Sequence, residues 1–260
     1  MATHLYTDRW MRWLVSLVLL CACPPAAVAC GLSLSWNDCA LGATAAASKA
    51  FACNTNDGYH VLTVSFDHYT DIPDVTGLYV FVDLVSESCP MPSWWEFRNS
   101  GSCRLAGLSA TALMLPWQTA CADPWQGQGS AAISGYYNPV QSSHRHSRIV
   151  ASVVVPAGFS VPIVAGTEYY GVNLLIRNQQ TVGAGACAGC TIAVCLVIAE
   201  VALTSIDSGE TRITSPGTSA LASWQPSGNF PCVCSHCDPP AICTTPVVNR
   251  TWGQIKSLYR

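Results

Sequence analysis

The segment that decides the fold class of this chain is Gly77-Leu-Tyr-Val-Phe-Val-Asp-Leu-Val85. It is rich in β-branched and aromatic residues, and its pattern has a period of two, which is typical of a strand rather than a helix. His60–Phe66 has the same period, with Val64 and Phe66 on the same face as Leu62. We therefore expect both segments to be β-strands.

Similar segments continue outward along the chain, at Arg148–Val155, Glu168–Arg177 and Ile192–Thr204, with shorter candidates at Leu32–Trp36, Trp94–Arg98, Glu210–Thr214 and Ala220–Trp224. Turn signals separate them, at Asn56-Asp57-Gly58, Ser134-Gly135, Pro156-Ala157-Gly158 and Pro216-Gly217. Only Ala43–Phe51 and Cys103–Leu115 are candidates for helices, and both are short. Many strands without alternating helices predict an all-β fold, either an antiparallel β-sandwich or a jelly roll.

The first 29 residues have the pattern of a secretory signal peptide. Arg9 and Arg12 precede the apolar run Leu14–Leu20, and Ala27-Val28-Ala29 has the form of a cleavage site. The apolar run is shorter than the about 20 residues that cross a bilayer. The sequence therefore predicts an exported protein that is extracellular or on the cell surface.

The composition changes after Gln225, where Pro226-Ser227-Gly228 begins a segment rich in cysteine and proline. We predict three parts: a signal peptide at 1–29, a disulfide-rich β-sandwich domain at 30–225, and a linker with a sorting or anchoring tag at 226–260. The middle part is long enough for one such domain.

Cysteine is the most informative residue type, with 15 in the chain. In an exported protein this density indicates disulfides. Eight candidates lie in the body, namely Cys39, Cys53, Cys89, Cys103, Cys121, Cys187, Cys190 and Cys195, and four in the tail, namely Cys232, Cys234, Cys237 and Cys243. We interpret Cys187-x-x-Cys190 as a stapled turn that involves Cys195 and one distant partner. A zinc site in the tail is the alternative, but an oxidising exterior favours disulfides, and we predict no metal.

Two further cysteines are candidates for lipidation. Cys30 follows the Ala27-Val28-Ala29 site, and Leu20-Cys21-Ala22-Cys23 resembles a lipobox that would make Cys23 the first residue. The alternative is ordinary cleavage without a lipid. Membrane contact is predicted only through the signal peptide or such a lipid anchor.

Charge excludes one class of partner. Charged residues make up 10% of the chain, against roughly 25% in typical globular proteins. Removal of the signal peptide takes away two arginines and one aspartate, so the formal net charge changes from −3 to −4. Without a basic stripe, nucleic acid is not expected as a partner.

Aromatic residues supply the predicted ligand-binding site. Trp94, Trp117 and Trp125 are candidates for a platform on which sugar rings stack, and Glu96 shares the face of Trp94 if both lie on a strand. The adjacent tyrosines Tyr136-Tyr137 and Tyr169-Tyr170 are further candidates for this platform. Neighbouring residues on a strand point in opposite directions, so we expect about half of these rings in the core.

Catalytic chemistry has little support in the sequence. The candidate carboxylates are Asp67, Asp71, Asp74, Asp83, Glu96, Glu168 and Glu200, and no pattern pairs two of them as glycoside hydrolysis requires. The first three are also candidate calcium ligands, but a polar turn is the favoured interpretation. His144-Arg145-His146 with Arg148 is a cationic cluster that suits a metal or an anion, although we favour a solvated loop. Nucleophile-elbow, HExxH and P-loop motifs are absent, so we assign no catalytic residue and no cofactor.

Several phrases resemble those of a group of exported bacterial proteins. They are Leu34–Cys39, Phe51–Asn56 (FACNTN), Pro92–Glu96, Gly101–Arg104 (GSCR), Gly185–Cys190 (GACAGC) and Ser223–Gln225. The ending Thr251–Arg260 (TWGQIKSLYR) resembles a short ending found on otherwise different exported proteins. The resemblance implies export, a shared β-sandwich-like fold and a C-terminal tag, and it brings no activity.

These observations favour a non-catalytic surface protein with a structural or adhesive role. Its expected partner is the cell envelope, or an extracellular glycan or protein. A carbohydrate-binding module that uses exposed tryptophans is the first alternative. A secreted hydrolase with an unrecognised carboxylate site is the second.

Overall fold

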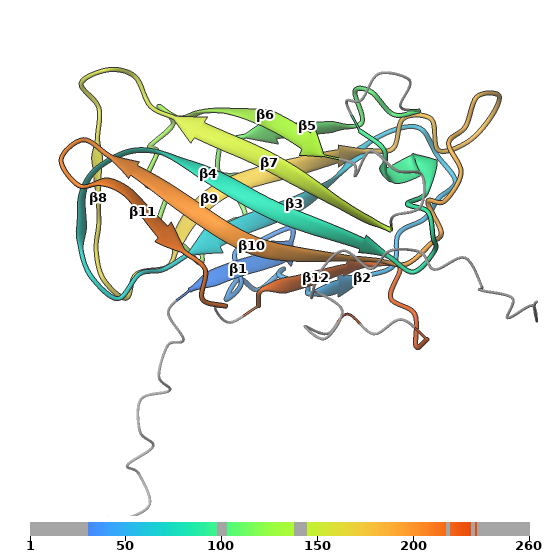
Figure 1. Cartoon of the computed structure of the whole chain (residues 1–260), viewed down its shortest axis with the longest axis horizontal. Coiled ribbons are helices and arrows are strands. Elements are labelled where there is room, and N and C mark those ends of the chain that lie inside the picture. Colours follow the sequence, from blue (N-terminus) through green and yellow to red (C-terminus); the bar gives the residue numbers. More distant parts are fainter. Residues whose placement is uncertain (1–30, 98–102, 138–144, 217–218, 230–231, 233–260) are drawn as a thin grey trace, which may run out of the picture.

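The computed structural model describes residues 31–97, 103–137, 145–216, 219–229 and 232. The predicted signal peptide, the lipidation candidates Cys23 and Cys30, and most of the predicted tag lie outside these residues. The described strands form two sheets that pack face to face (Figure 1). The predicted all-β sandwich is therefore confirmed.

The smaller sheet has four antiparallel strands in the order β1-β3-β9-β5. Their bounds are Leu32–Trp36 for β1, Tyr59–Phe66 for β3, Tyr169–Arg177 for β9 and Leu108–Thr111 for β5. Side chains of even-numbered residues in β1 and β3, such as Leu34, Leu62 and Val64, point inward and are fully buried.

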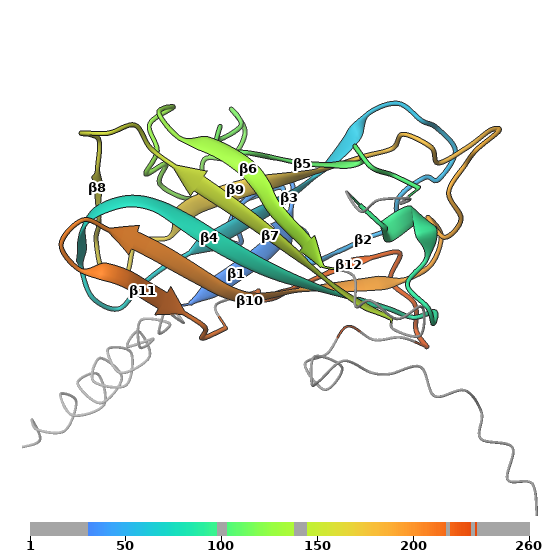
Figure 2. The same ribbon diagram turned by 45° about the horizontal axis from the view of Figure 1, so that its top comes forward.

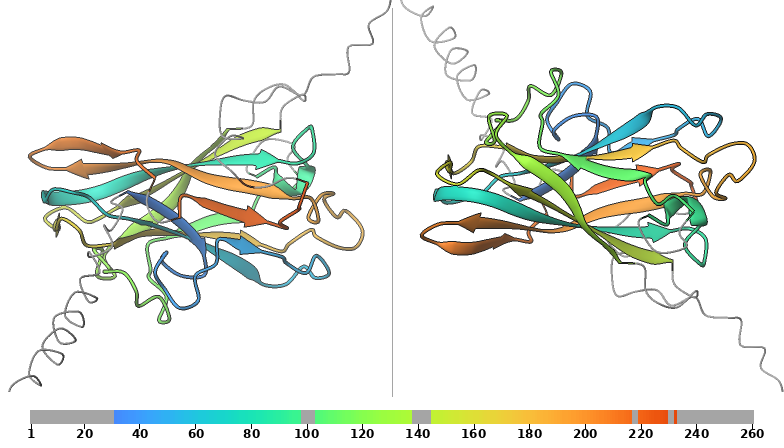
Figure 3. Two further views of the ribbon diagram at one scale, coloured as in Figure 1. Left: turned by 90° about the horizontal axis from the view of Figure 1, so that it is seen from below. Right: turned by 90° about the horizontal axis from the view of Figure 1, so that it is seen from above.

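The larger sheet has eight strands, six of which follow the order β2-β12-β10-β4-β7-β6. Their bounds are Ser48–Lys49 for β2, Leu221–Trp224 for β12, Val194–Ser205 for β10, Ile72–Ser86 for β4, His146–Val154 for β7 and Ser130–Tyr137 for β6. Gly209–Ile213 (β11) pairs with β10, and Val161–Ile163 (β8) pairs with β4. Figures 2 and 3 show the two sheets as separate layers.

The core fills the space between the layers and continues into a cluster of aromatic rings at one end. The alternation in β4 explains the large-sheet side of the core, because Leu78, Val80, Val82 and Leu84 are at most 1% exposed. At the end of the sandwich, Trp224 stacks on Phe51 with 4.0 Å between ring centroids.

Three local expectations were wrong. Ala43–Phe51 is not helical, because Trp36 N–H donates to Ala46 O and Ser48–Lys49 pairs with β12. Cys103–Leu115 is not helical, because residues 108–111 pair with β9 as β5. In both segments tertiary pairing overrides local helix propensity. Trp94–Arg98 is not a strand in its described part, since Ser93–Trp95 form a short 3₁₀ helix, η1.

The Ser134-Gly135 turn signal was also misread. Both residues lie inside β6, at a register shift between Ile133 and Gly135 in the pairing with β7. Glycine inside a strand often marks such a bulge rather than a turn.

Four disulfides join described cysteines, and they are Cys39–Cys121, Cys53–Cys190, Cys103–Cys187 and Cys195–Cys232. Cys89 is disulfide-bonded as well. The interpretation of Cys187, Cys190 and Cys195 as one staple with a single distant partner was wrong, because each has its own distant partner. Cys195–Cys232 also joins the body to the tail, so the two sets of cysteines are not separate. Cys234, Cys237 and Cys243 lie outside the described residues.

The disulfides are consistent with an extracytoplasmic protein. Among the described residues, no helix has the length and apolar character needed to cross a membrane.

Candidate functional site

The four predicted ligand-binding residues do not form one surface. Trp94 and Trp125 are completely buried, and their indole N–H groups donate to Thr181 Oγ1 at 2.9 Å and Gly171 O at 2.7 Å. A ring enclosed in this way cannot stack on a ligand from solvent, so both are core residues. Trp117 is 50% exposed and donates its N–H to Asn37 O. Glu96 is half-buried and follows η1, so it does not share a strand face with Trp94.

A buried polar layer lies on the outer face of the smaller sheet. Thr63 and Asn173 are neighbours on β3 and β9, and both are fully buried although they point away from the core. Residues 112–121, which we call the strap, cover them. Gln118 of the strap donates its amide to Thr63 Oγ1 at 2.7 Å and accepts from Asn173 Nδ2 at 2.9 Å.

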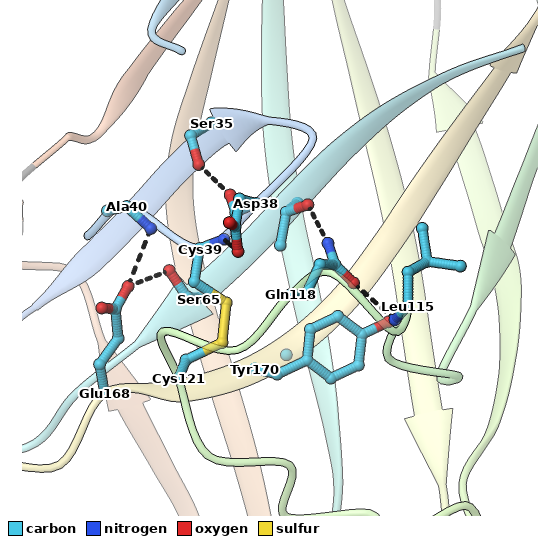
Figure 4. The surroundings of a disulfide bond; sticks show 12 residues. Ser35, Asp38, Cys39, Ala40, Ser65, Leu115, Gln118, Cys121, Glu168 and Tyr170 are labelled. Carbon is cyan, nitrogen blue, oxygen red and sulfur yellow. Dashed lines mark hydrogen bonds between the residues drawn. A yellow bond between two sulfur atoms is a disulfide. The ribbon is translucent and has the colours of Figure 1, made fainter. Parts of the chain in front are cut away.

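The strap is fastened at its end by the Cys39–Cys121 disulfide (Figure 4). Its backbone bonds back to the same network, since Leu115 N–H donates to Gln118 Oε1 at 2.8 Å. The Tyr170 hydroxyl donates to Thr111 O at 2.8 Å where the strap begins. Burial raises the pKa of Tyr170 far above its ordinary value, so this phenol stays neutral. The strap and its polar layer therefore act as a rigid cover.

Glu168, beside this disulfide, has one carboxylate oxygen without a hydrogen bond to any described residue. Its Oε1 accepts from Ser65 Oγ at 2.6 Å and Ala40 N–H at 3.1 Å, whereas Oε2 is buried without a partner among the described residues (Figure 4). Asp38, in the same region, uses both oxygens, on Cys39 N–H and Thr44 Oγ1. Both carboxylates therefore hold the backbone at Cys39 and Ala40 in place.

Three further candidate carboxylates each hold a different piece of backbone or side chain. Asp67 accepts from Gly31 N–H, Asp71 from Ala165 N–H and Asp74 from Ser160 Oγ. Because the three bind different loops, they do not converge on one cation. The described residues contain no group of three or more His, Cys, Asp or Glu that could hold a metal ion.

The outer face of the larger sheet presents aromatic and aliphatic side chains to solvent. Tyr79, Tyr137 and Val154 are 43%, 62% and 55% exposed, and Phe81 is half-buried. With Val150, these residues form what we call the aromatic face. In Figure 1 this sheet lies in front, with β4 and β7 crossing over the smaller sheet behind them.

The register places the aromatic face on three neighbouring strands. Phe81 of β4 lies opposite Val150 of β7, which lies opposite Gly135 of β6. A Cβ at Gly135 would come within 2.8 Å of Cε2 of Tyr137, so the hydroxyl end of the Tyr137 ring lies directly over this glycine. Strands are spaced by about 4.8 Å, so the backbones of Gly135 and Phe81, two strands apart in one row, are separated by roughly 10 Å.

Ion pairs between oppositely charged side chains of the larger sheet flank the aromatic face. Arg148 donates to both oxygens of Asp83 at 2.6 and 2.7 Å, and His146 Nε2 lies 3.3 Å from Asp83 Oδ1. Arg212 pairs with Glu200 and Glu210 at 2.8 and 2.6 Å. The predicted cationic cluster is therefore corrected. His146 and Arg148 belong to β7 and share one carboxylate, and His144 lies outside the described residues.

The ion pairs of Asp83 lead us to a prediction about how the stability of the protein depends on pH. Burial raises the pKa of Asp83, but hydrogen bonds from Arg148 and His146 outweigh burial and hold the pKa below its ordinary value. A lowered carboxyl pKa adds stability that is present above about pH 4 and is lost as the pH falls further. We expect urea midpoints of the wild type to decrease below about pH 4. Asp83→Asn should cost roughly 1 kcal/mol at neutral pH and flatten that decrease.

The control for this prediction is Asp207→Asn, which changes an exposed aspartate in the turn between β10 and β11. It should leave the pH profile of the wild type unchanged. An Asp83→Asn profile parallel to that of the wild type at every pH would contradict the prediction.

Sequence reasoning missed the aromatic face as a unit. The signal was present in β4, where Tyr79, Phe81 and Asp83 alternate with the buried leucine and valines. The sequence analysis did not predict β6, however, so it could not place Tyr137 next to β7. Tyrosine, rather than the predicted tryptophan, therefore supplies the exposed rings of this face.

No protein-family model and no curated protein matches this chain. Among solved structures, the chain is similar to a cohesin module from a family 33 glycoside hydrolase of Clostridium perfringens ATCC13124. The match has 7% sequence identity and a TM-score of 0.31, and it covers 75% of this chain and 93% of that module. At this TM-score the fold assignment rests on the strand order and pairing given above. The resemblance to exported bacterial proteins stays a prediction.

Proposed function

We propose that the protein is an exported, non-catalytic β-sandwich with a structural or adhesive role at the cell surface, and that the aromatic face is its contact surface. One observation carries the proposal. Six of the seven candidate carboxylates, all except Glu96, hold loops and strands in place, whereas the broad outer face of the larger sheet exposes rings that the fold does not need for its core. Exposed apolar patches of this kind commonly mark interaction sites.

The charges around the aromatic face support contact rather than chemistry. Asp83 with Arg148, and Glu200 with Arg212, are already paired within the sheet. A partner that covers the face leaves these charges paired, so the cost of desolvation is smaller than for isolated charges.

Carbohydrate binding is a second candidate, favoured by the exposure of one ring. Tyr137 is 62% exposed, and its hydroxyl end lies over Gly135 on the outer face of the sheet. Stacking on the C–H side of a sugar requires an exposed ring.

The test is co-sedimentation of the purified mature chain with cell envelopes of the producing organism and with insoluble neutral polysaccharides. We expect the double variant Tyr79→Ala/Tyr137→Ala to bind at least about tenfold more weakly, because exposed aromatic anchors dominate contact energies. Loss of binding to envelopes alone indicates an adhesive role. Loss of binding to a neutral polysaccharide favours the carbohydrate-binding alternative.

The matched control is Tyr59→Ala/Tyr69→Ala, which removes two other exposed tyrosines, at 49% and 76% exposure, from outside the aromatic face. This control should bind like the wild type. Equal loss in both double variants would contradict the assignment of the aromatic face. Hydrolysis of a glycan, ester or peptide by the purified chain would overturn the non-catalytic role.

A further inference from the structure

Arg104 is a buried cation without an acidic partner among the described residues. Its side chain is completely buried, with Nε donating to Gln179 O at 3.1 Å and one terminal nitrogen donating to Trp94 O at 2.7 Å. The other terminal nitrogen, Nη2, is buried without a hydrogen bond. Within the described part of the chain, no carboxylate lies within 4.0 Å of this guanidinium.

Aromatic rings compensate part of the cost of this burial. The guanidinium carbon lies 3.5 Å from the centroid of the Trp94 ring and 5.2 Å from that of Phe97. Burial lowers the pKa of Arg104 to about 9, so the group remains charged at neutral pH. The charge also acts on its surroundings, because it adds to the effect of burial in lowering the pKa of His60. A charged group left in this state calls for a compensating ion.

An open depression of about 600 Å³ lies beside Arg104, at the end of β9 and the start of β5, lined by Leu105, Ala106, Leu108, Ser109, Arg177 and Gln179. Two contacts connect it to the buried guanidinium. Arg104 Nε donates to the backbone of the lining residue Gln179. Gly107 lies between two lining residues, and a Cβ there would be 3.2 Å from the guanidinium carbon, so the charge packs directly against this backbone.

Arg177 brings a second positive charge to the same place. Its side chain is exposed, and it forms no ion pair with any described residue. Its backbone N–H donates to Gly107 O at 2.8 Å, which fixes β9 against the turn that contains Arg104. Arg104 and Arg177 therefore place two positive charges beside the depression, and neither forms an ion pair within 4.0 Å with a described carboxylate.

We propose that this depression binds an anionic group, a carboxylate or a sulfate carried by an acidic polysaccharide. Arg177 contacts the anion through paired N–H groups, as guanidinium commonly does with such oxyanions. Ser109 and Gln179 supply polar contacts at the rim. Arg104 does not touch the ligand and acts as a positioning residue, since its charge beneath Gly107 strengthens attraction in a region of reduced dielectric constant. The site is independent of the aromatic face.

The experiment measures binding of the full mature chain to three soluble polymers, namely polygalacturonate, dextran sulfate and uncharged dextran. We expect binding to an acidic polymer, weakened by salt, and none to dextran. Arg177→Gln should weaken that binding by at least about tenfold, and Arg177→Lys should retain part of it because the charge remains. Preference for polygalacturonate identifies a carboxylate ligand, and preference for dextran sulfate identifies a sulfated one.

The matched control is Arg212→Gln, which removes another exposed arginine of a strand, far along the larger sheet. It should bind the acidic polymer like the wild type. The proposal is overturned if neither acidic polymer binds, or if Arg212→Gln weakens binding as much as Arg177→Gln. The Tyr79→Ala/Tyr137→Ala variant should retain acidic-polymer binding, so failure of this site and failure of the aromatic face are distinguishable.

Discussion

Replacing Cys53 and Cys190 together with alanine is expected to lower the free energy of unfolding by about 4 kcal/mol. The two residues are separated by 137 positions, but Cys103–Cys187 already shortens the path between them in the unfolded chain. The shortest path through the disulfides named above runs from Cys53 to Cys39, across the Cys39–Cys121 bridge to Cys103, and across the second bridge from Cys187 to Cys190. It contains about 35 residues, for which loop-closure entropy gives the quoted value.

The loss is large because a domain has only about 5–15 kcal/mol of net stability. Cys53 also fixes the segment that places Phe51 in the core, where Gln225 bonds both Phe51 N–H and Phe51 O. The measurement is guanidinium unfolding of the variant and the wild type, each oxidised and fully reduced. The reduced proteins should differ by less than about 1 kcal/mol, since the bond itself is then absent from both. An oxidised variant as stable as the wild type would contradict the prediction.

Period-two patterning was sufficient to predict the principal strands. Leu32–Trp36 has the predicted bounds, and β4, β9 and β10 contain or closely match the predicted segments. These strands bury one face in the core, so apolar residues recur at every second position of their sequences and predict the strand. The long strand β4 shows this most clearly, with four inward aliphatic residues between outward Tyr79, Phe81 and Asp83.

The errors arise where long-range contacts decide the local structure. β5 is an edge strand of four residues whose partner, β9, lies more than 60 positions along the chain. β6 contains Ser134-Gly135, and the glycine is required by the Tyr137 ring that lies on it rather than by a turn. Neither reason can be read from a single segment. Disulfide pairing has the same character, because Cys187 and Cys190 are neighbours in sequence with partners in different loops.

The burial of two tryptophans explains why the four predicted ligand-binding residues do not form one surface. Of the predicted residues, Trp94 and Trp125 fill the core, where their large apolar area contributes most to stability. Tyrosine, which has a polar end, supplies the exposed rings instead. The sequence predicted that some aromatic rings are exposed, but not which ones. Burial of a ring depends on how the strap and the end loops cover the sheets.

The aromatic cluster at the end of the sandwich is the basis of the second prediction with a large expected effect on stability. Trp224 is completely buried, and its ring lies 4.0 Å from Phe51, 4.8 Å from Trp94 and 5.4 Å from Trp95, measured between centroids. Its indole N–H donates to Cys190 O at 2.6 Å. Trp224→Ala should lower the free energy of unfolding by about 3–5 kcal/mol, because it leaves a cavity among closely packed rings.

Two controls separate the possible causes of this loss. Trp224→Phe keeps an aromatic ring but removes the N–H, so it should cost about 1–3 kcal/mol through the unpaired carbonyl of Cys190 and incomplete filling. Trp117→Ala removes the same side chain from a half-exposed position and should cost less than about 1 kcal/mol. Guanidinium unfolding followed by circular dichroism measures all three. Equal losses for Trp224→Ala and Trp117→Ala would show that the cluster around Trp224 does not stabilise the sandwich, because only Trp224 is enclosed by other rings.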